Sequence, residues 1–306
     1  MSRILALLAG IAACATLSTA ALADTAPPAK PFPAPTAGTL FIAAQTTNTS
    51  GAMASWFTPG TTVVFRALAL DTKTLKTLDA KGITYFYVTI PNQPNVKLKY
   101  DPTAPGATPR MPWTGKWTVP SNYPAGIVPF KILAKSTFGH RGSFVQIPVA
   151  TSKLTISSTA SAPFGAGPSP TAATAPPAKS DLGIYVDTVN GTSPVGVAKR
   201  PVGCSQTNVF KRGEQVVIRV WGFDLKSGDT LSTDNVDTAT ATIAGVAAPL
   251  TLGYGAHGAT GAKVFFWSTP WIVPATFPLG DVTIHVAFKT VAGAAGTFDY
   301  PITIVP

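Results

Sequence analysis

The sequence predicts an all-β protein that contains two similar domains. Only 12% of its 306 residues are charged, and 29 prolines and 27 glycines interrupt the chain. Residues 24–306 contain a single glutamate, Glu214. Helical proteins usually cover their solvent faces with Glu, Lys and Arg, which are good helix formers. This composition therefore favours short strands joined by turns.

One stretch of the chain occurs twice, at residues 117–144 and 271–298. Its landmarks lie 154 positions apart: Trp117/Trp271, Pro120/Pro274, Pro124/Pro278, Gly126/Gly280, Lys135/Lys289, Gly142/Gly296 and Phe144/Phe298. Each copy predicts a turn, a strand, a Gly-x-x-Gly turn and a second strand. Two copies of such a stretch predict two domains of the same fold.

The first 23 residues have the pattern of a secretory signal peptide, with Arg3 before an apolar run and Ala21-Leu22-Ala23 as the cleavage motif. The alternative is a lipoprotein signal that lipidates Cys14. Cleavage after residue 23 predicts a periplasmic or secreted protein with no further transmembrane span. It also leaves Cys204 as the only cysteine, which excludes an internal disulfide. We expect Cys204 to be buried, with a free thiol or an intermolecular partner as alternatives.

Two proline-rich segments divide the rest of the chain. Residues 24–38 predict an extended tether, and residues 158–180 a semi-rigid linker rich in Pro, Ala and Ser. The hexapeptide TAPPAK occurs in both, which indicates that the copied piece was a tether plus a domain. We expect domain 1 at residues 39–157 and domain 2 at residues 181–306, arranged as beads on a string.

Alternating and β-branched segments predict about seven short strands in each domain. In domain 1 they are residues 39–44, 61–70, 83–90, 96–100 and 127–135, with residues 143–149 and 152–157 as a last strand interrupted by Pro148; in domain 2 they are residues 182–187, 215–223, 238–243, 263–267, 282–288 and 297–305. Val128, Phe130, Ile132 and Ala134 share one face of their strand, which we expect to be the core face. Short strands in this number and spacing predict an immunoglobulin-like β-sandwich.

Four segments are similar to tandem immunoglobulin-like domains of bacterial secreted proteins: YPAGIV at 123–128, its copy FPLGDV at 277–282, and the Lys-x-x-x-Gly-x-x-Gly hairpins at 135–142 and 289–296. The resemblance covers most of both repeats. It implies two β-sandwiches joined by a Pro/Ala-rich linker. Because many functions use this fold, it implies binding, spacing or assembly more often than catalysis.

Charge is distributed unequally between the two domains. Residues 39–157 hold 12 Lys and Arg against 3 Asp, a balance of +9, whereas residues 181–306 hold 8 against 9, a balance of −1. The candidate partner-binding residues of domain 1 are Lys97, Lys99, Arg110, Trp113, Lys116 and Arg141, with Lys131 and Lys135 completing the basic set. Such a surface favours an acidic partner or an anionic glycan. The alternative is a scattered solvated face that aids solubility.

Domain 2 has about eleven additional residues within Pro194–Phe210, where Lys199 and Arg200 are further candidates for a partner contact. The pairs Trp113/Trp117 and Trp267/Trp271 predict either core packing or a platform on which a sugar ring stacks. Arg66 and Arg219 lie in the second strands. We expect Arg219 to lie over Trp221, and Asp71 and Asp224 to shape the following turns.

No catalytic, cofactor-binding or metal-binding pattern is found, since the chain has three dispersed histidines and one glutamate. We therefore expect a non-enzyme without cofactors, and no nucleic-acid partner. The leading hypothesis is an exported binding or accessory subunit of a periplasmic or cell-surface assembly, with a protein partner in the envelope. The alternative is a carbohydrate- or polyanion-binding module that uses the Trp113–Trp117 region, and the third is a hydrolase.

Overall fold

The structure, a computed structural model, describes residues 39–103, 111–147, 149–158, 179–191, 200, 203–257 and 264–306. Its regular structure consists of strands and one 3-10 turn, η1 (Ala150–Ser152), so the described chain is all-β. The expected signal peptide with Cys14, the tether at 24–38 and nearly all of the linker at 158–180 lie outside these residues.

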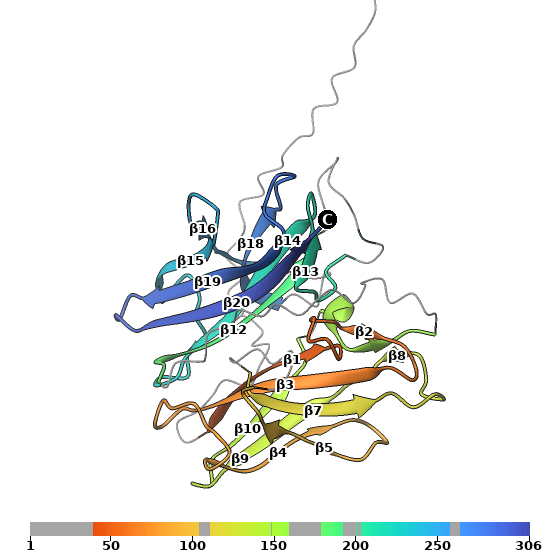
Figure 1. The fold of residues 1–306 in the computed structure, drawn as a ribbon. Helices are drawn as coiled ribbons and strands as arrows, with labels where there is room; N and C mark the ends of the chain where they lie inside the picture. Colours follow the sequence, from red (N-terminus) through yellow and green to blue (C-terminus); the bar gives the residue numbers. More distant parts are fainter. Residues whose placement is uncertain are drawn as a thin grey trace, which may run out of the picture.

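The described residues within 39–158 form a sandwich-like unit, called unit 1. Its strands are β1 (Leu40–Thr47), β2 (Trp56–Phe57), β3 (Thr62–Asp71), β4 (Ile83–Thr89), β5 (Val96–Lys97), β6 (Lys99–Tyr100), β7 (Trp113–Thr118), β8 (Gly126–Ile127), β9 (Lys131–Ser136), β10 (Arg141–Val145) and β11 (Thr155–Ile156). The inner sheet has the order β1-β3-β7-β6, the outer sheet β10-β9-β4-β5, and a small third sheet β2-β11-β8. Figure 1 shows β9, β4 and β5 on the side of unit 1 that is away from the rest of the chain.

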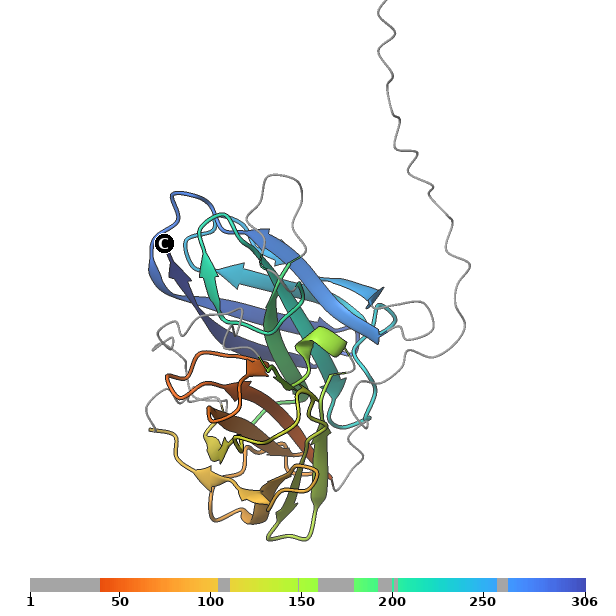
Figure 2. The same cartoon turned by 90° about the vertical axis from the view of Figure 1, so that its right-hand side faces the viewer.

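Residues 179–306 form the corresponding unit 2. Its strands are β12 (Leu182–Asn190), β13 (Val209–Lys211), β14 (Gln215–Asp224), β15 (Val236–Ile243), β16 (Leu250–Thr251), β17 (Gly253–His257), β18 (Val264–Ile272), β19 (Gly280–Thr290) and β20 (Ala295–Val305). The inner sheet is β12-β14-β18-β17 and the outer sheet is β13-β20-β19-β15-β16. None of these five sheets takes strands from both units. In Figure 2 unit 2, coloured green to blue, lies directly above unit 1, coloured red to yellow-green.

Alternation of side chains builds the core of each unit. In β9 and the residues before it, Val128, Phe130, Ile132 and Ala134 are all buried, which confirms the expected core face. Between the two sheets of unit 1, the rings of Phe65 and Phe130 meet edge to face with centroids 5.0 Å apart. The same kind of contact joins the sheets of unit 2.

The predicted strand at 96–100 is divided in the structure. β5 pairs with β4 in the outer sheet, whereas β6 pairs with β7 in the inner sheet. Leu98 lies between them and is buried, so the chain crosses from one sheet to the other at this residue. Alternation alone cannot reveal the crossing, because a bend leaves the pattern of polar and apolar residues unchanged.

Two of the duplicated glycines are required by backbone geometry. Gly126 and Gly280 have φ values of 133° and 110°, a region that residues with a Cβ rarely enter. A Cβ on Gly142 would lie 2.2 Å from the carbonyl oxygen of Leu40, so β1 can cross the start of the hairpin only over a glycine. These positions recur in both copies because both copies make the same turn and the same crossing.

The first strands, β1 and β12, are buried along their whole length. One face of each packs into its own unit, and the other face is covered by the other unit. The expectation of two independent beads is therefore wrong, because a buried interface joins the units. The first halves of these strands are apolar at nearly every position, the pattern of a strand that is covered on both faces, whereas their second halves bury polar residues as well.

Candidate functional site

The outer sheet of unit 1 exposes a face made of three cross-strand rows. The first row pairs Arg141 with Lys135 and Lys135 with Tyr85. The second row runs from Ser143 through Leu133 and Tyr87 to Lys97, and the third from Val145 through Lys131 to Thr89. Directly paired residues lie on the same face of a sheet. These ten residues are called the basic tyrosine face.

Two tyrosines lie at the centre of the basic tyrosine face. Tyr85 and Tyr87 are two positions apart on β4, and their ring centroids are 5.3 Å apart with an interplanar angle of 37°. Both side chains are partly exposed, whereas Phe86 between them points into the core against Trp113. The rings therefore offer an aromatic surface to solvent on a rigid strand.

Four cations surround this aromatic centre: Lys97, Lys131, Lys135 and Arg141. Lys135 and Arg141 are directly opposite each other, and like charges in that position destabilise a sheet. The rows contain no carboxylate, and no ion pair is found for these four cations among the residues that the structure describes. An anionic ligand would relieve this repulsion.

The candidate residues named from the sequence do not form one patch. Lys97 and Arg141 belong to the basic tyrosine face. Lys99 and Lys116 are exposed on the inner sheet of the same unit, which is the opposite side of the sandwich. Arg110 and Lys199 lie outside the described residues. Sequence position could not separate the two sides, because the crossing at Leu98 places neighbouring lysines on different sheets.

Trp113 belongs to the core and offers no surface to a partner. It is 5% exposed, and its Nε1 donates to the carbonyl oxygen of Leu78 at 3.1 Å. Trp267 repeats the arrangement in unit 2, donating to the carbonyl oxygen of Leu231 at 2.8 Å. Trp117 is likewise buried. A stacking platform at Trp113–Trp117 is therefore incompatible with the structure, because the rings are enclosed between the sheets.

Arg200, the remaining candidate, is bound within unit 2. Its Nε and Nη2 donate to the two carboxylate oxygens of Glu214 at 2.8 and 2.6 Å, and Nη2 also donates to the carbonyl oxygen of Val209. A bidentate pair of this kind holds the additional segment of unit 2 to its body. Arg200 is thus a structural residue and not a free contact for a partner.

Tyr85 and Tyr87 are the residues of the face that the sequence-based predictions missed. The signal was present in the segment ITYFYVTI, where Tyr85 and Tyr87 alternate with Phe86 and Val88. Aromatic and β-branched residues indicate a strand, but they do not indicate which face is buried. The pairing of Lys97 and Lys135 with the tyrosines decides this, since an exposed cation marks the solvent face.

A second polar feature lies at the interface of the two units. Arg219 Nε and Nη2 donate to the two carboxylate oxygens of Asp187 at 2.7 and 2.6 Å, and both side chains are almost fully buried. Burial by itself lowers the pKa of Arg219, but the charge of Asp187 raises the pKa above the usual value. The guanidinium also lies over the ring of Trp221, as predicted, with its carbon 5.4 Å from the ring centroid.

Asp71 and Asp224 cap the turns that follow β3 and β14, as predicted. Each carboxylate accepts two backbone N–H groups of the next residues, at 2.8 to 3.1 Å. Asp71 has a further partner, the Nδ1 of His140 at 2.6 Å. Burial opposes ionisation of Asp71, but the N–H groups of Thr74 and Lys73 and the His140 ring together lower its pKa below the usual 3.8.

Three further features of the described residues concern metal binding, membrane spans and the thiol of Cys204. No group of three or more His, Cys, Asp or Glu side chains there is arranged to hold a metal ion. Among the described residues no helix has the length and hydropathy needed to cross a membrane. Cys204 has a free thiol and is partly exposed, so the expectation that it is buried is not met.

Comparison with known proteins does not assign the chain to a family. No family model matches it, and no curated protein matches it. A solved structure of dimeric latent PorU from Porphyromonas gingivalis aligns with 10% identity over 86% of this chain and 24% of that chain, with a TM-score of 0.25. The Bacteroides ovatus protein SGBP-B of a mixed-linkage glucan utilization locus, in complex with a mixed-linkage heptasaccharide, aligns with 10% identity, with a TM-score of 0.18.

The SGBP-B alignment covers 82% of this chain and 43% of that one, so the chain spans less than half of either solved structure. At these TM-scores neither likeness bears on what the chain binds. The residues of the chain itself must support any functional conclusion.

Proposed function

We propose that this chain is an exported, non-catalytic binding protein, an accessory subunit of a periplasmic or cell-surface assembly, built from two immunoglobulin-like β-sandwich domains. We propose further that it binds an anionic glycan on the basic tyrosine face of unit 1. The face lies on the outer sheet, on the side of unit 1 opposite to the inner sheet that packs against unit 2.

One observation carries this proposal: four cations without an ion pair among the described residues surround two partly exposed tyrosine rings. The cross-strand pair Lys135–Arg141 opposes folding, since each cation raises the electrostatic energy of the other. A fold has no need of such a pair, and unit 2 forms the same sheet without it. A ligand with several negative charges supplies the missing counterions.

The tyrosines favour a sugar over an acidic protein segment. The C–H groups of a pyranose ring form a flat apolar surface, which packs well on an aromatic ring, while the phenol hydroxyls bond to sugar hydroxyls. Cations alone would serve an acidic peptide equally well. Acidic sugars combine both features, because each ring presents an apolar face and a carboxylate or sulfate.

The test is isothermal titration of the chain from residue 24 with alginate, a polyuronate, and with dextran, a neutral glucan, at about 0.05 M and about 0.5 M salt. We expect alginate to bind at low salt and to weaken at least several-fold at high salt, and dextran not to bind. In the double variant Tyr85→Ala/Tyr87→Ala we expect alginate affinity to fall about tenfold, because stacking is lost while the charge is unchanged.

The matched control is Thr238→Ala/Thr240→Ala, which changes the equivalent positions of unit 2 and should leave alginate affinity unchanged. Binding that survives the loss of both tyrosines would show simple charge attraction, and the glycan proposal would then be wrong. Absence of alginate binding together with salt-sensitive capture of one acidic envelope protein would instead support the protein-partner hypothesis.

A further inference from the structure

The interface between the units has contacts in which a residue meets its own counterpart. Thr155 and Thr303 are equivalent, since the next residues, Ile156 and Ile304, pair with the duplicated glycines Gly126 and Gly280. Trp56 pairs with Thr155 and Val209 pairs with Thr303, so Ala54 and Thr207, each two residues earlier, are equivalent as well. Ala54 and Thr207 form an antiparallel bridge with each other across the interface. A residue can meet its counterpart in this way only where an approximate two-fold axis relates the two units.

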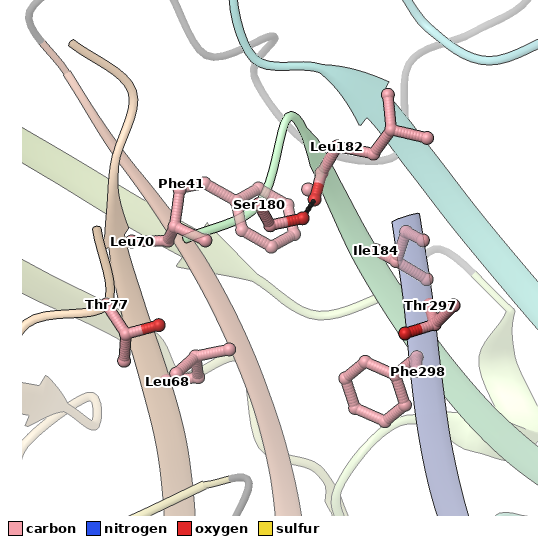
Figure 3. A pocket seen from close by; sticks show the side chains of 10 residues that line it. Phe41, Leu68, Leu70, Thr77, Ser180, Leu182, Ile184, Thr297 and Phe298 are labelled. Atoms are coloured by element: carbon pink, nitrogen blue, oxygen red, sulfur yellow. Dashed lines mark hydrogen bonds between the residues drawn. The ribbon is translucent and has the colours of Figure 1, made fainter. Parts of the chain in front are cut away.

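A second contact of the same kind lies on the first strands. Phe41 pairs with Leu70 in β1–β3 as Gly183 pairs with Phe223 in β12–β14, so Phe41 and Gly183 are equivalent. The Phe41 ring packs directly on Gly183, where a Cβ would lie 3.1 Å from the ring. The same ring also reaches Phe223, with centroids 6.1 Å apart. Figure 3 shows Phe41, Leu68 and Leu70 of unit 1 facing Ile184 and Phe298 of unit 2.

Hydrogen bonds beside the axis are repeated in both units. The Thr46 hydroxyl donates to the carbonyl oxygen of Ala54 at 2.6 Å, and the equivalent Thr188 donates to that of Thr207 at 2.5 Å. Both bonds support the residues that form the central bridge. The interface therefore has the organisation of a two-fold symmetric dimer, although both halves belong to one chain.

One group of polar side chains breaks this symmetry. Asp187, which pairs with Arg219 across β12 and β14, stands where unit 1 has Gln45 opposite Arg66. Arg219 also donates from Nη1 to the Ser152 hydroxyl of unit 1 at 3.0 Å, and Ser152 donates to the carbonyl oxygen of Cys204 at 2.7 Å. Asp187, Arg219, Gln206, Ser152 and Cys204 are called the interface clamp; Gln206 Nε2 donates to Asp187 at 2.7 Å.

Two members of the interface clamp, Ser152 and Cys204, come from segments that one unit has and the other lacks. Phe144 and Phe298 are 154 positions apart, but Ile156 and Ile304 are 148 apart, so unit 1 has six additional residues here, and η1 with Ser152 is among them. Cys204 belongs to the eleven-residue addition of unit 2. The two additions meet at the Ser152–Cys204 bond, and Thr151 reaches the same carbonyl at 3.4 Å.

We propose that this interface is a self-recognition surface that accepts another unit of the same fold, and that the interface clamp makes it specific for pairing unit 1 with unit 2. Apolar contacts near the axis contribute to this specificity, because Phe41 packs on Gly183, its own counterpart: two copies of unit 1 would oppose two phenylalanine rings there, and two copies of unit 2 would oppose two glycines. The interface clamp adds polar specificity. Two copies of unit 2 would bury Arg219 without Ser152, and two copies of unit 1 would contain neither Asp187 nor Cys204.

In a pair of two units 2, Asp187 would still hold Nε and Nη2 of Arg219, but the buried Nη1 would lose its Ser152 acceptor, and an unpaired buried N–H of a charged group is unfavourable. The partner that fits the surface is therefore the other unit, supplied by the same chain or by a second copy through exchange. This inference does not depend on which ligand binds the basic tyrosine face.

The experiment uses the chain from residue 24 with a protease site introduced within residues 159–178, cut after folding. Native mass spectrometry then distinguishes pairs 1–1, 1–2 and 2–2, because the two units differ in mass. We expect the cut units to remain together, and every pair to contain one unit 1 and one unit 2. The same should hold after two isotopically distinct preparations are mixed and their units have exchanged partners. Separation into free units would overturn the surface, and a statistical mixture of the three pairs would overturn its specificity.

The variant Ser152→Ala isolates the interface clamp, because it removes one acceptor of Arg219 and leaves the apolar contacts unchanged. We expect the dissociation constant of the cut 1–2 pair to rise about tenfold or more. Ser50→Ala, in an exposed turn of the same unit, is the matched control and should change nothing. Circular dichroism confirms that both variants are folded, and an unchanged dissociation constant in folded Ser152→Ala would contradict the assigned role of the clamp.

Discussion

The outer faces of the two units have the same strands and very different chemistry. Tyr85, Tyr87, Lys97 and Arg141 of unit 1 occupy the positions of Thr238, Thr240, Thr251 and Ala295 of unit 2. Both sets are compatible with the sheet, since threonine and tyrosine both favour strands. The fold therefore tolerates either face, and folding does not explain the tyrosines and cations of unit 1.

The basic residues of unit 2 also differ in their partners. Lys289, the counterpart of Lys135, lies 3.5 Å from a carboxylate oxygen of Asp237, and His285, the counterpart of Lys131, lies 2.5 Å from Asp299. Carboxylates thus stand beside these basic residues on the outer face of unit 2, whereas the outer face of unit 1 has none in its three rows. This difference locates the proposed ligand on unit 1 alone.

The buried arginines give a second comparison. Arg219 has the carboxylate of Asp187, and Arg66 faces the neutral amide of Gln45. Burial lowers the pKa of Arg66 to about 10, against the attraction of Asp101, whereas the ion pair with Asp187 raises the pKa of Arg219. At this strand position unit 2 places a carboxylate opposite its buried arginine, whereas unit 1 places a neutral amide there.

The largest expected effect concerns this buried pair. Asp187→Ala leaves Arg219 buried without its carboxylate, and we expect it to lower the free energy of unfolding by about 3–5 kcal/mol. Gln45→Ala removes no charge and should cost about 1–2 kcal/mol. Urea unfolding followed by tryptophan fluorescence measures both. Equal losses in the two variants would show that the carboxylate is not what distinguishes the units.

The next effect concerns the outer faces. Lys135→Ala/Arg141→Ala should reduce alginate affinity at least tenfold at low salt, since two cations at the edge of the site are lost. Lys289→Ala in unit 2 is the matched control. The reverse change, Thr238→Tyr/Thr240→Tyr/Thr251→Lys/Ala295→Arg, should create a second site and raise the titrated stoichiometry from one to two. If the reverse variant is folded and the stoichiometry stays at one, the face alone is insufficient for binding.

A smaller effect on stability is expected at Asp71, which caps the turn after β3. The pKa of Asp71 is lower in the folded chain than its usual value of 3.8, so its contribution to stability is present above about that pH and is lost as pH falls through the folded pKa. Asp71→Asn should therefore cost about 1–2 kcal/mol at neutral pH and much less under strong acid. Thermal unfolding across that pH range measures the change, and an effect independent of pH would rule out the carboxylate as its cause.

The smallest effect is expected at the His285–Asp299 pair. The histidine side chain is 48% exposed, so solvent screens the pair, and His285→Ala should change the free energy of unfolding by less than about 1 kcal/mol. A larger loss would mean that the outer face of unit 2 contributes to folding in a way that the face of unit 1 does not.

Much of the fold follows from local pattern. The alternation at Val128–Ala134 identifies a core face because a strand reverses its side chains at every residue. Asp71 and Asp224 predict their turns because their carboxylates bond to N–H groups only two and three residues away. Such interactions are short in sequence, so they can be recognised without knowledge of the fold.

Only part of the candidate site can be predicted from the sequence, because its side chains are brought together by contacts that are far apart in the chain. Lys97 and Arg141 are distinguished by charge, but their position beside Tyr85 and Tyr87 depends on the pairing of four strands that are far apart in sequence. Trp113 has the ring chemistry of a sugar-stacking residue, but the two sheets of unit 1 enclose it. Residue type indicates what a side chain can do, and pairing decides whether a ligand can reach it.

By itself the sequence determined the all-β composition, the duplication at a spacing of 154 residues and the unequal charge of the two halves. The tertiary structure alone decided that the halves pack together about an approximate two-fold axis, and which cations share a face. The physical reason is that a strand has two faces, and its sequence does not state what covers each of them. β1 and β12 are buried on both faces because each meets the other unit, a contact between residues about 140 positions apart.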